Sequence, residues 1–151
     1  EVELDMLKNK VTGVAKPVPV IMNLIEGFDP YASAAAFAME NGNAQPFITG
    51  SGAWITVIDH HNNEYCKING TKKLTAKLRE DPYLMKLIEY AAYYNKSAEH
   101  EMWRIKYETL LKKLYLELDE LLQQKETSKE SKEKSDALDS QLDSALDNID
   151  V

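Results

Sequence analysis

The order of apolar and polar positions predicts several short elements followed by one long helix. We expect a short amphipathic helix over residues 3–15, because apolar residues recur there at helical spacing. These positions are Leu4, Leu7, Val11 and Val14. The segment "KPVPV" then favours an extended conformation. We expect "VIMNLIEG" to form one or two helical turns that Gly27 ends.

Two Asp-Pro pairs mark helix starts, because Asp caps the first turn and Pro fits the first helical position. Asp29-Pro30 begins a helix of small residues, "YASAAAFAM", that ends at Asn41-Gly42. Asp81-Pro82 begins a second helix, in which Leu84, Leu87, Ile88 and Ala91 are expected to face inward. A shorter helix before it is expected to be capped by Thr71 and to carry Leu74 and Leu78.

Residues 54–58 and 65–68 alternate in polarity on either side of the polar turn "DHHNNE", which predicts a β-hairpin. One face of the hairpin would hold Ile55, Val57, Cys66 and Ile68, and the other Trp54, Thr56, Tyr65 and Lys67. We expect "AQPFITGSG" to be a loop or a poor edge strand. An isolated hairpin is marginal in water, so this one should dock on helices.

The most regular pattern predicts a helix over about 98–124, with Ser97 as its cap. Its apolar stripe suits pairing with another helix, either within the chain or in a short coiled coil. The stripe consists of Tyr107, Leu111, Leu114, Leu118 and Leu121, and is widened by Trp103, Leu110 and Leu122.

Two polar segments follow this helix. Residues 123–135, "QQKETSKESKEKS", have too little apolar surface to order themselves and predict a low-complexity linker. Residues 136–151 form an acidic tail that would be a barely populated helix in isolation. One face of that helix would carry Leu138, Leu142, Ala145, Leu146 and Ile149.

Three interpretations of the tail remain open. It is a disordered solubilising end, a helix that docks in a groove of a partner, or a segment that folds back on the basic run of residues 67–79 and mimics the charge of nucleic acid. The regular leucine spacing favours docking, since a solubilising tail needs no leucines.

Together these elements predict a mostly α fold with one β-hairpin, in the α+β class. The helical domain is expected over residues 1–122 with the hairpin at about 54–69, the linker over 123–135, and a partly disordered docking segment over 136–151. With 44% apolar and 28% charged residues, the chain has a globular composition.

One cysteine excludes an internal disulfide framework and favours a reducing, cytoplasmic location. No apolar run approaches the roughly 18 residues of a membrane span, so we expect no membrane partner. The net charge of −7 is uneven along the chain. Residues 67–79 contain five basic residues and no acid, whereas residues 135–151 contain five aspartates and no base.

The basic run offers an alternative function, the binding of single-stranded nucleic acid. Basic side chains follow the backbone of a single strand and aromatic rings stack on its bases. Tyr90, Tyr93 and Tyr94 would add further rings. The residues proposed for this surface are Trp54, Tyr65, Lys67, Lys72, Lys73, Lys77 and Arg79.

The stretch "ITVIDHHNN" resembles the motif of the DHH phosphoesterases, in which an apolar strand ends in Asp-His-His at a metal centre. The resemblance implies that Asp59, His60 and His61 would be associated with metal and help activate a water. It covers only this short stretch, and no histidine occurs upstream of it. We therefore place this function third and interpret the stretch as a solvated hairpin turn.

The pattern as a whole favours a non-enzymatic interaction or assembly protein without a cofactor. We expect a protein partner, with a homo-oligomer included, and no catalytic or metal-binding residue. Tyr107, Leu111, Leu114, Leu118 and Leu121 would serve helix pairing. Leu138, Leu142, Leu146 and Ile149 would serve docking.

Overall fold

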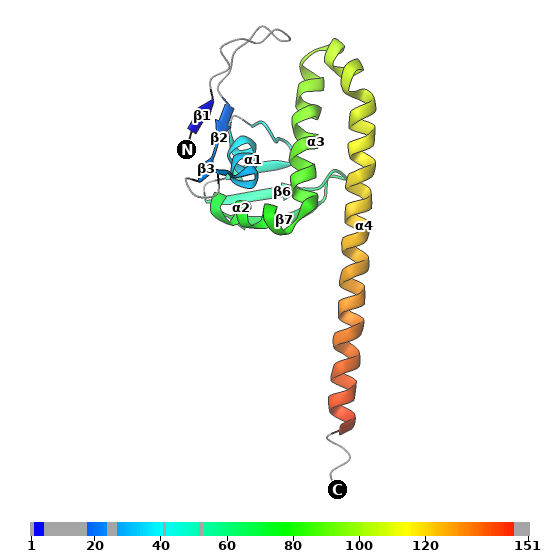
Figure 1. Cartoon of the computed structure of the whole chain (residues 1–151). Helices are drawn as coiled ribbons and strands as arrows, with labels where there is room; N and C mark the ends of the chain where they lie inside the picture. Colours follow the sequence, from blue (N-terminus) through cyan, green and yellow to red (C-terminus); the bar gives the residue numbers. More distant parts are fainter. Residues whose placement is uncertain (1, 5–17, 24–26, 41, 52, 147–151) are drawn as a thin grey trace. The chain divides into compact units, whose positions relative to one another are not determined.

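The computed structural model of the chain describes residues 2–4, 18–23, 27–40, 42–51 and 53–146, with the backbone alone for residues 2–4, 18–19, 23, 51 and 138–146. Within these ranges the chain is mostly helical with short antiparallel strands, which confirms the α+β class (Figure 1). The elements are β1 (Val2–Leu4), β2 (Val18–Val20), β3 (Met22–Asn23), β4 (Gly27–Phe28), α1 (Pro30–Met39), β5 (Ile48–Ser51), β6 (Trp54–Ile58), β7 (Glu64–Asn69), α2 (Thr71–Glu80), α3 (Pro82–Glu99) and α4 (Glu101–Leu146).

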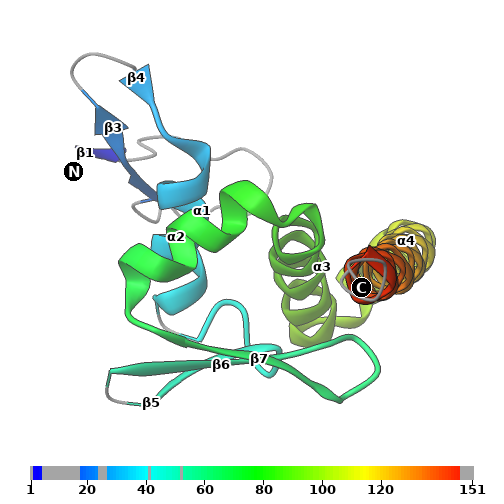
Figure 2. The same cartoon turned by 90° about the horizontal axis from the view of Figure 1, so that it is seen from below.

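The predicted hairpin is part of a three-stranded antiparallel sheet in the order β5-β6-β7. Ile55 pairs with Ile68 and Val57 with Cys66, so these four side chains share a face as predicted. The helices α1, α2 and α3 cover one face of this sheet (Figure 2). Because the backbone of β5 pairs with β6 from Ile48 to Ser51, the segment that we expected to be a loop or poor edge strand is an edge strand.

Further strands lie where the sequence predicted helix. Residues 2–4 pair with residues 18–20 as β1 and β2, so the first predicted helix is wrong at its start, and residues 5–15 lie outside the described residues. The expected helical turns in "VIMNLIEG" are also wrong, because Met22 pairs with Phe28 across β3 and β4. Short apolar runs fit strand and helix equally well, and the β-branched residues before β3 favour the strand.

Both Asp-Pro helix starts are confirmed. The Asp29 carboxylate accepts hydrogen bonds from the backbone amides of Tyr31 and Ala32 at the start of α1, each at 3.0 Å. Asp81 accepts from the amide of Tyr83 at 3.2 Å at the start of α3. The N-cap position of α2 is Gly70 and not Thr71. The buried core includes Val57, Leu74, Leu78, Leu84, Leu87 and Ala91.

The long helix begins and ends later than predicted. Ser97 lies within α3, where its hydroxyl donates to the carbonyl of Tyr94 at 2.7 Å. The residue before α4 is His100, whose Nδ1 accepts from the amide of Met102 at 3.1 Å. The helix continues through the predicted linker to Leu146. Residues 123–135 contain no Gly or Pro and are rich in Lys, Glu and Gln, which are good helix formers.

The chain divides into two compact units, Glu1–Leu118 and Asp119–Val151. The first unit contains the core residues named above. In the second unit, the described side chains of residues 126–137 are exposed. The docking segment 136–151 is helical in backbone up to Leu146, and Ile149 lies outside the described residues. The domain limits at residues 122 and 135 stay a prediction.

Candidate functional site

The first turns of α4 run antiparallel to α3 (Figure 1). Aromatic side chains of the two helices contact each other. The ring centroids of Tyr93 and Tyr107 lie 5.1 Å apart. Those of Tyr90 and Tyr115 lie 6.2 Å apart. Trp103 stacks on Tyr107 with 5.7 Å between centroids and 9° between ring planes. Bulky rings therefore fill the space between the two helices, and Tyr90 and Tyr93 are engaged in this packing.

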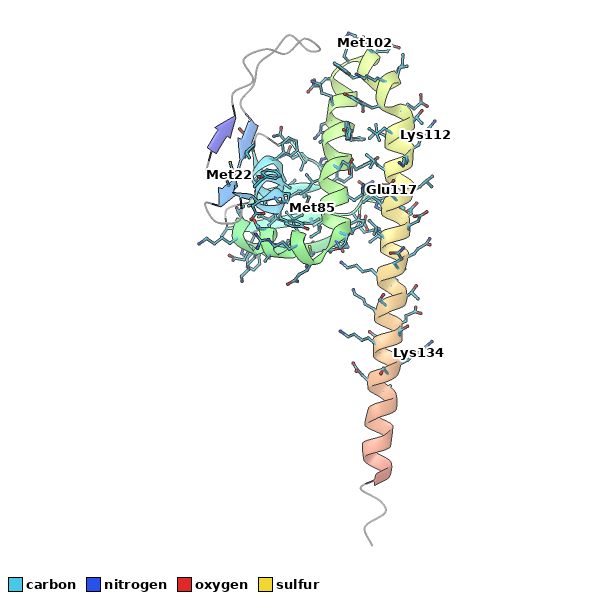
Figure 3. The ribbon with its side chains drawn as sticks, in the orientation of Figure 1. Met22, Met85, Met102, Lys112, Glu117 and Lys134 are labelled. Carbon is cyan, nitrogen blue, oxygen red and sulfur yellow. The ribbon has the colours of Figure 1, made fainter. Side chains whose placement is uncertain are left out.

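A salt bridge joins the same two helices. The ammonium of Lys86 on α3 lies 3.1 Å from the Glu117 carboxylate on α4 and 2.9 Å from Glu89 on its own helix. The hydrogen bond from Lys86 lowers the pKa of the Glu117 carboxyl. The bonds to Glu89 and Glu117 raise the pKa of the Lys86 ammonium. The Lys86 ammonium and the Glu117 carboxylate are therefore both charged at neutral pH (Figure 3 labels Glu117).

Some of the residues predicted for helix pairing are buried within the chain itself. Leu114 and Leu118 are 2% and 0% exposed, and Tyr107 and Leu111 are half-buried. Leu121 belongs to the second unit and is also half-buried. Leu138, Leu142 and Leu146 lie in α4, but their side chains are outside the description. The buried residues of this seam are unavailable to a partner while the first unit is folded.

A different face of α4 carries large apolar side chains that are exposed. Met102, Ile105 and Leu116 are 60%, 68% and 62% exposed. Ile105 and Leu116 are three helical turns apart and Met102 precedes Ile105 by three residues, so all three lie on one side of the helix. We call these three residues the α4 stripe. Figure 3 shows Met102 at the start of the helix.

An apolar groove borders the α4 stripe. It has a volume of about 410 Å³ and is lined by Tyr90, Leu111, Lys112, Tyr115 and Leu116. Burial raises the pKa of Tyr90, and the neighbouring Tyr94 and Tyr115 raise it further, so its hydroxyl is uncharged at neutral pH. Leu116 is common to the groove and the stripe, so the groove adjoins the stripe at its C-terminal end, whereas Glu108, Thr109 and Lys112 lie on the same side of the helix between Ile105 and Leu116.

Basic side chains surround this surface. Lys112 lies 2.7 Å from Glu108 and Lys113 lies 3.7 Å from Glu117. The ammonium of Lys106 lies 4.9 Å from the centroid of the Trp103 ring. Ion pairs between exposed side chains of one helix contribute little to stability, so these lysines can exchange partners at small cost.

The residues proposed for nucleic-acid binding are only partly brought together. Trp54 is 53% exposed, and Lys72 and Lys73 are exposed in the first turn of α2, which follows the strand paired with Trp54. Lys67 lies 3.2 Å from Glu64, and Lys77 is half-buried. Arg79 forms a salt bridge with Asp29, and its guanidinium lies 5.9 Å from the centroid of the Tyr31 ring.

We predicted that Tyr65 and Trp54 share one face of the hairpin, and this prediction is wrong. Ile58 pairs with Glu64 and Val57 with Cys66, so Tyr65 is an extra residue at a β-bulge. The bulge turns its side chain to the helices that cover the sheet. There the hydroxyl donates to the Asp81 carboxylate at 2.7 Å and the ring centroid lies 4.8 Å from that of Tyr83. Burial first, and then the hydrogen bond to Asp81, raise the pKa of the Tyr65 hydroxyl.

The Asp-His-His stretch lies in the turn between β6 and β7, but it is not solvated throughout. Asp59 and His60 are 8% and 6% exposed, which corrects the expected solvated loop. One carboxylate oxygen of Asp59 accepts from the amides of His61 and Asn63 at 2.9 and 2.8 Å. The Nδ1 atom of His60 lies 3.0 Å from the Tyr83 hydroxyl. Asp59 thus organises the turn and His60 packs against the start of α3.

Sequence reasoning missed Met102, Ile105, Leu116, Tyr90 and Tyr115 as members of one surface. The spacing of three and eleven residues among the first three was a usable signal, because it places them on one helical face. The groove was not foreseeable, since Tyr90 and Tyr115 come from two helices whose relative register depends on packing.

Comparisons with protein-family models, with curated proteins and with solved structures find no match. Among the helices described, none combines the length and apolar character needed to cross a membrane.

Proposed function

We propose that this chain is a non-enzymatic assembly protein whose α4 stripe and adjoining groove bind another protein chain, a second copy in the first instance. The carrying observation is that three large apolar side chains on one face of α4 are at least 60% exposed beside an apolar groove. Single exposed apolar side chains are common on monomers, but several of them on one helix face beside an apolar groove favour an interface.

The magnitude of burial supports association of moderate strength. Each of the three side chains would contribute about 1.5–3 kcal/mol if fully buried. Their sum is comparable with the free-energy cost of the translational and rotational freedom lost on association, which is about 4–15 kcal/mol. The groove and the surrounding lysines would therefore have to supply additional contacts. We expect a reversible complex whose amount depends on protein concentration.

The acidic tail remains part of this proposal as a second contact. Leu138, Leu142, Leu146 and Ile149 recur at helical spacing in the sequence, and the backbone is helical as far as Leu146. A leucine face on a helix is suited to a groove of a partner. The partner-binding surface of α4 is revised from the seam around Leu114 and Leu118, which is buried, to the α4 stripe.

Sedimentation velocity of the full chain over a range of concentrations tests the proposal. Leu116→Glu places a charge in the centre of the apolar surface and should shift the full chain towards monomer. Gln124→Glu adds the same charge at an exposed position of α4 outside that surface and should leave association unchanged. Thermal unfolding followed by circular dichroism verifies that both variants fold.

Two results would contradict the assembly function. One is a full chain that stays monomeric at every concentration. The other is a chain that associates equally well after Leu116→Glu and Ile105→Glu, which would place the interface elsewhere.

Single-stranded nucleic acid is a second candidate partner, supported by the exposed Trp54 beside the basic first turn of α2. Binding of a labelled oligonucleotide at low salt, followed by fluorescence anisotropy, tests it. Lys72→Glu with Lys73→Glu should weaken binding and reduce its dependence on salt concentration. Absence of binding, both in the natural chain and with the tail aspartates changed to Asn, ends this candidate.

A further inference from the structure

The α4 stripe and its groove need an occupant with an apolar face of matching length. From Ile105 to Leu116 the stripe extends over three helical turns, which is roughly 16 Å. Glu108, Thr109 and Lys112 lie on the same side of the helix between its two ends. In the acidic tail, Leu138 and Ile149 are separated by the same three turns, with Leu142 and Leu146 between them. A helical tail would therefore present an apolar face of the same length as the stripe. Aromatic and aliphatic groove walls suit such a face.

The charges around the two segments are complementary. Between residues 101 and 117, α4 carries four cations, Arg104, Lys106, Lys112 and Lys113, and three acids, Glu101, Glu108 and Glu117, which form ion pairs with Arg104, Lys112 and Lys113. The tail from residue 135 onwards carries five aspartates and no base. Lys112 lines the groove itself, so an aspartate beside a docked leucine would meet an ammonium at the rim. Charge complementarity of this kind selects the partner and its orientation.

The surface and the tail are more readily joined between two copies than within one. Residues 119–137 are helical in α4. A reversal of the chain between the stripe and the tail would need a break in this helix. The tail of a second copy can bind without that break.

We propose that the α4 stripe and groove of one copy bind the acidic, leucine-bearing tail of a second copy, residues 136–149. This inference rests on the proposed function of the same surface and names its partner. The contact joins a surface of one copy to a different segment of the other, so a pair of copies could make it twice, once in each direction. Its strength should fall with salt concentration, because the charges involved are exposed.

Charge reversal in full-length chains tests this assignment. The stripe variant carries Lys112→Glu and Lys113→Glu, and the tail variant carries Asp139→Lys and Asp143→Lys. Each variant alone should self-associate about tenfold more weakly than the natural chain, since favourable pairs become repulsive. An equimolar mixture of the two variants should regain association, because the reversed stripe then meets the reversed tail.

A matched control carries Lys129→Glu and Lys132→Glu, the same charge change at exposed positions of α4 outside both segments. It should behave as the natural chain in sedimentation velocity. If the mixture does not associate while Leu116→Glu still dissociates the natural chain, the tail is not the occupant and the assembly function stands. If Leu116→Glu has no effect either, both proposals are wrong.

Discussion

Tyr65 shows how one inserted residue changes the use of a side chain. The β-bulge places it on the helix-covered side of the sheet, where its hydroxyl bonds to Asp81, a carboxylate that is 4% exposed and caps α3. A buried carboxylate is stable only while donors surround it. Tyr65 therefore links the sheet to the start of α3, and it is unavailable for stacking on a nucleic-acid base.

We expect Tyr65→Phe to lower the free energy of unfolding by about 1–2 kcal/mol, because the Asp81 oxygen loses a donor in a buried setting. Urea denaturation followed by circular dichroism measures the change. Tyr94→Phe is the matched control, because Tyr94 is 42% exposed and water replaces the contacts of its hydroxyl. Equal stability of the two variants would show that the Tyr65–Asp81 bond contributes nothing.

Individual residues were predictable from the sequence where their role depends on immediate neighbours. Asp29 and Asp81 are helix caps, and Asp-Pro is a local signal that needs no knowledge of the fold. The side of the sheet on which Tyr65 lies was not predictable, because alternation is counted from an unbroken strand and the bulge shifts the count. The burial of His60 was not predictable either, because it depends on Tyr83, which follows it by 23 residues in the sequence.

At the scale of elements, the apolar residues of α4 divide between two uses. Leu114 and Leu118 belong to the core, whereas Ile105 and Leu116 are exposed. The sequence predicted the helix correctly, because a regular apolar spacing is a strong signal. It did not show which leucines face inward, since that depends on how α3 packs against α4.

The division can be measured with a pair of leucine truncations. Leu118→Ala should lower the free energy of unfolding by about 2–5 kcal/mol, because it leaves a cavity at a fully buried site. Leu116→Ala should change it by less than about 0.5 kcal/mol, provided that the protein is dilute enough to be monomeric. Similar losses in the two variants would contradict the assignment of Leu116 to an exposed face.

The salt bridge between α3 and α4 predicts a pH dependence. The pKa of Glu117 is lower in the folded chain than its ordinary value of 4.5. The contribution of the ionised Glu117 to the free energy of unfolding is therefore fully present above pH 4.5. The contribution is lost as the pH falls through the folded-state pKa. The stability difference between the natural chain and Glu117→Gln should therefore be largest near neutral pH and shrink in acid. Urea unfolding at a series of pH values measures it.

Glu133→Gln is the control for this experiment, since Glu133 lies at an exposed position in the second unit. Its effect on stability should stay small at every pH. A Glu117→Gln effect that does not vary with pH would show that the Lys86–Glu117 pair does not stabilise the fold.

The short strands mark the limit of prediction at this scale. A run such as "VIMN" is too short to separate helix from strand by periodicity, and β3 forms because β4 is available to pair with it. In the same way, the sequence of β5 fits a loop and an edge strand, and its pairing with β6 makes it a strand. Pairing is a property of two segments together, so it is not contained in either alone.

At the scale of the whole molecule, the two compact units differ in what stabilises their helices. Residues 101–118 of α4 pack through Leu114, Leu118 and the aromatic cluster, whereas residues 126–137 have exposed side chains. A helix without packing is marginal, since propensity alone seldom offsets the cost of nucleation. The predicted linker is therefore helical in backbone and still poor in stabilising contacts.

Amide hydrogen exchange followed by mass spectrometry tests this difference. Amides of residues 104–118 should exchange at least about tenfold more slowly than those of residues 126–137, because the latter open by local fraying. If association through the tail occurs, exchange in residues 136–149 should slow at high protein concentration. Uniform protection along α4 at low concentration would show that the second unit has stabilising contacts of its own.

The stacking of Trp103 on Tyr107 has a spectroscopic consequence. The chain contains two tryptophans, and Trp103 lies next to Met102 at the start of the α4 stripe while Trp54 lies in the sheet. With Trp54→Phe, the remaining indole emission would report on one end of the assembly surface alone. Burial of that end by a second chain would move the emission to shorter wavelength, so Trp103 would serve as an intrinsic optical probe of the proposed association.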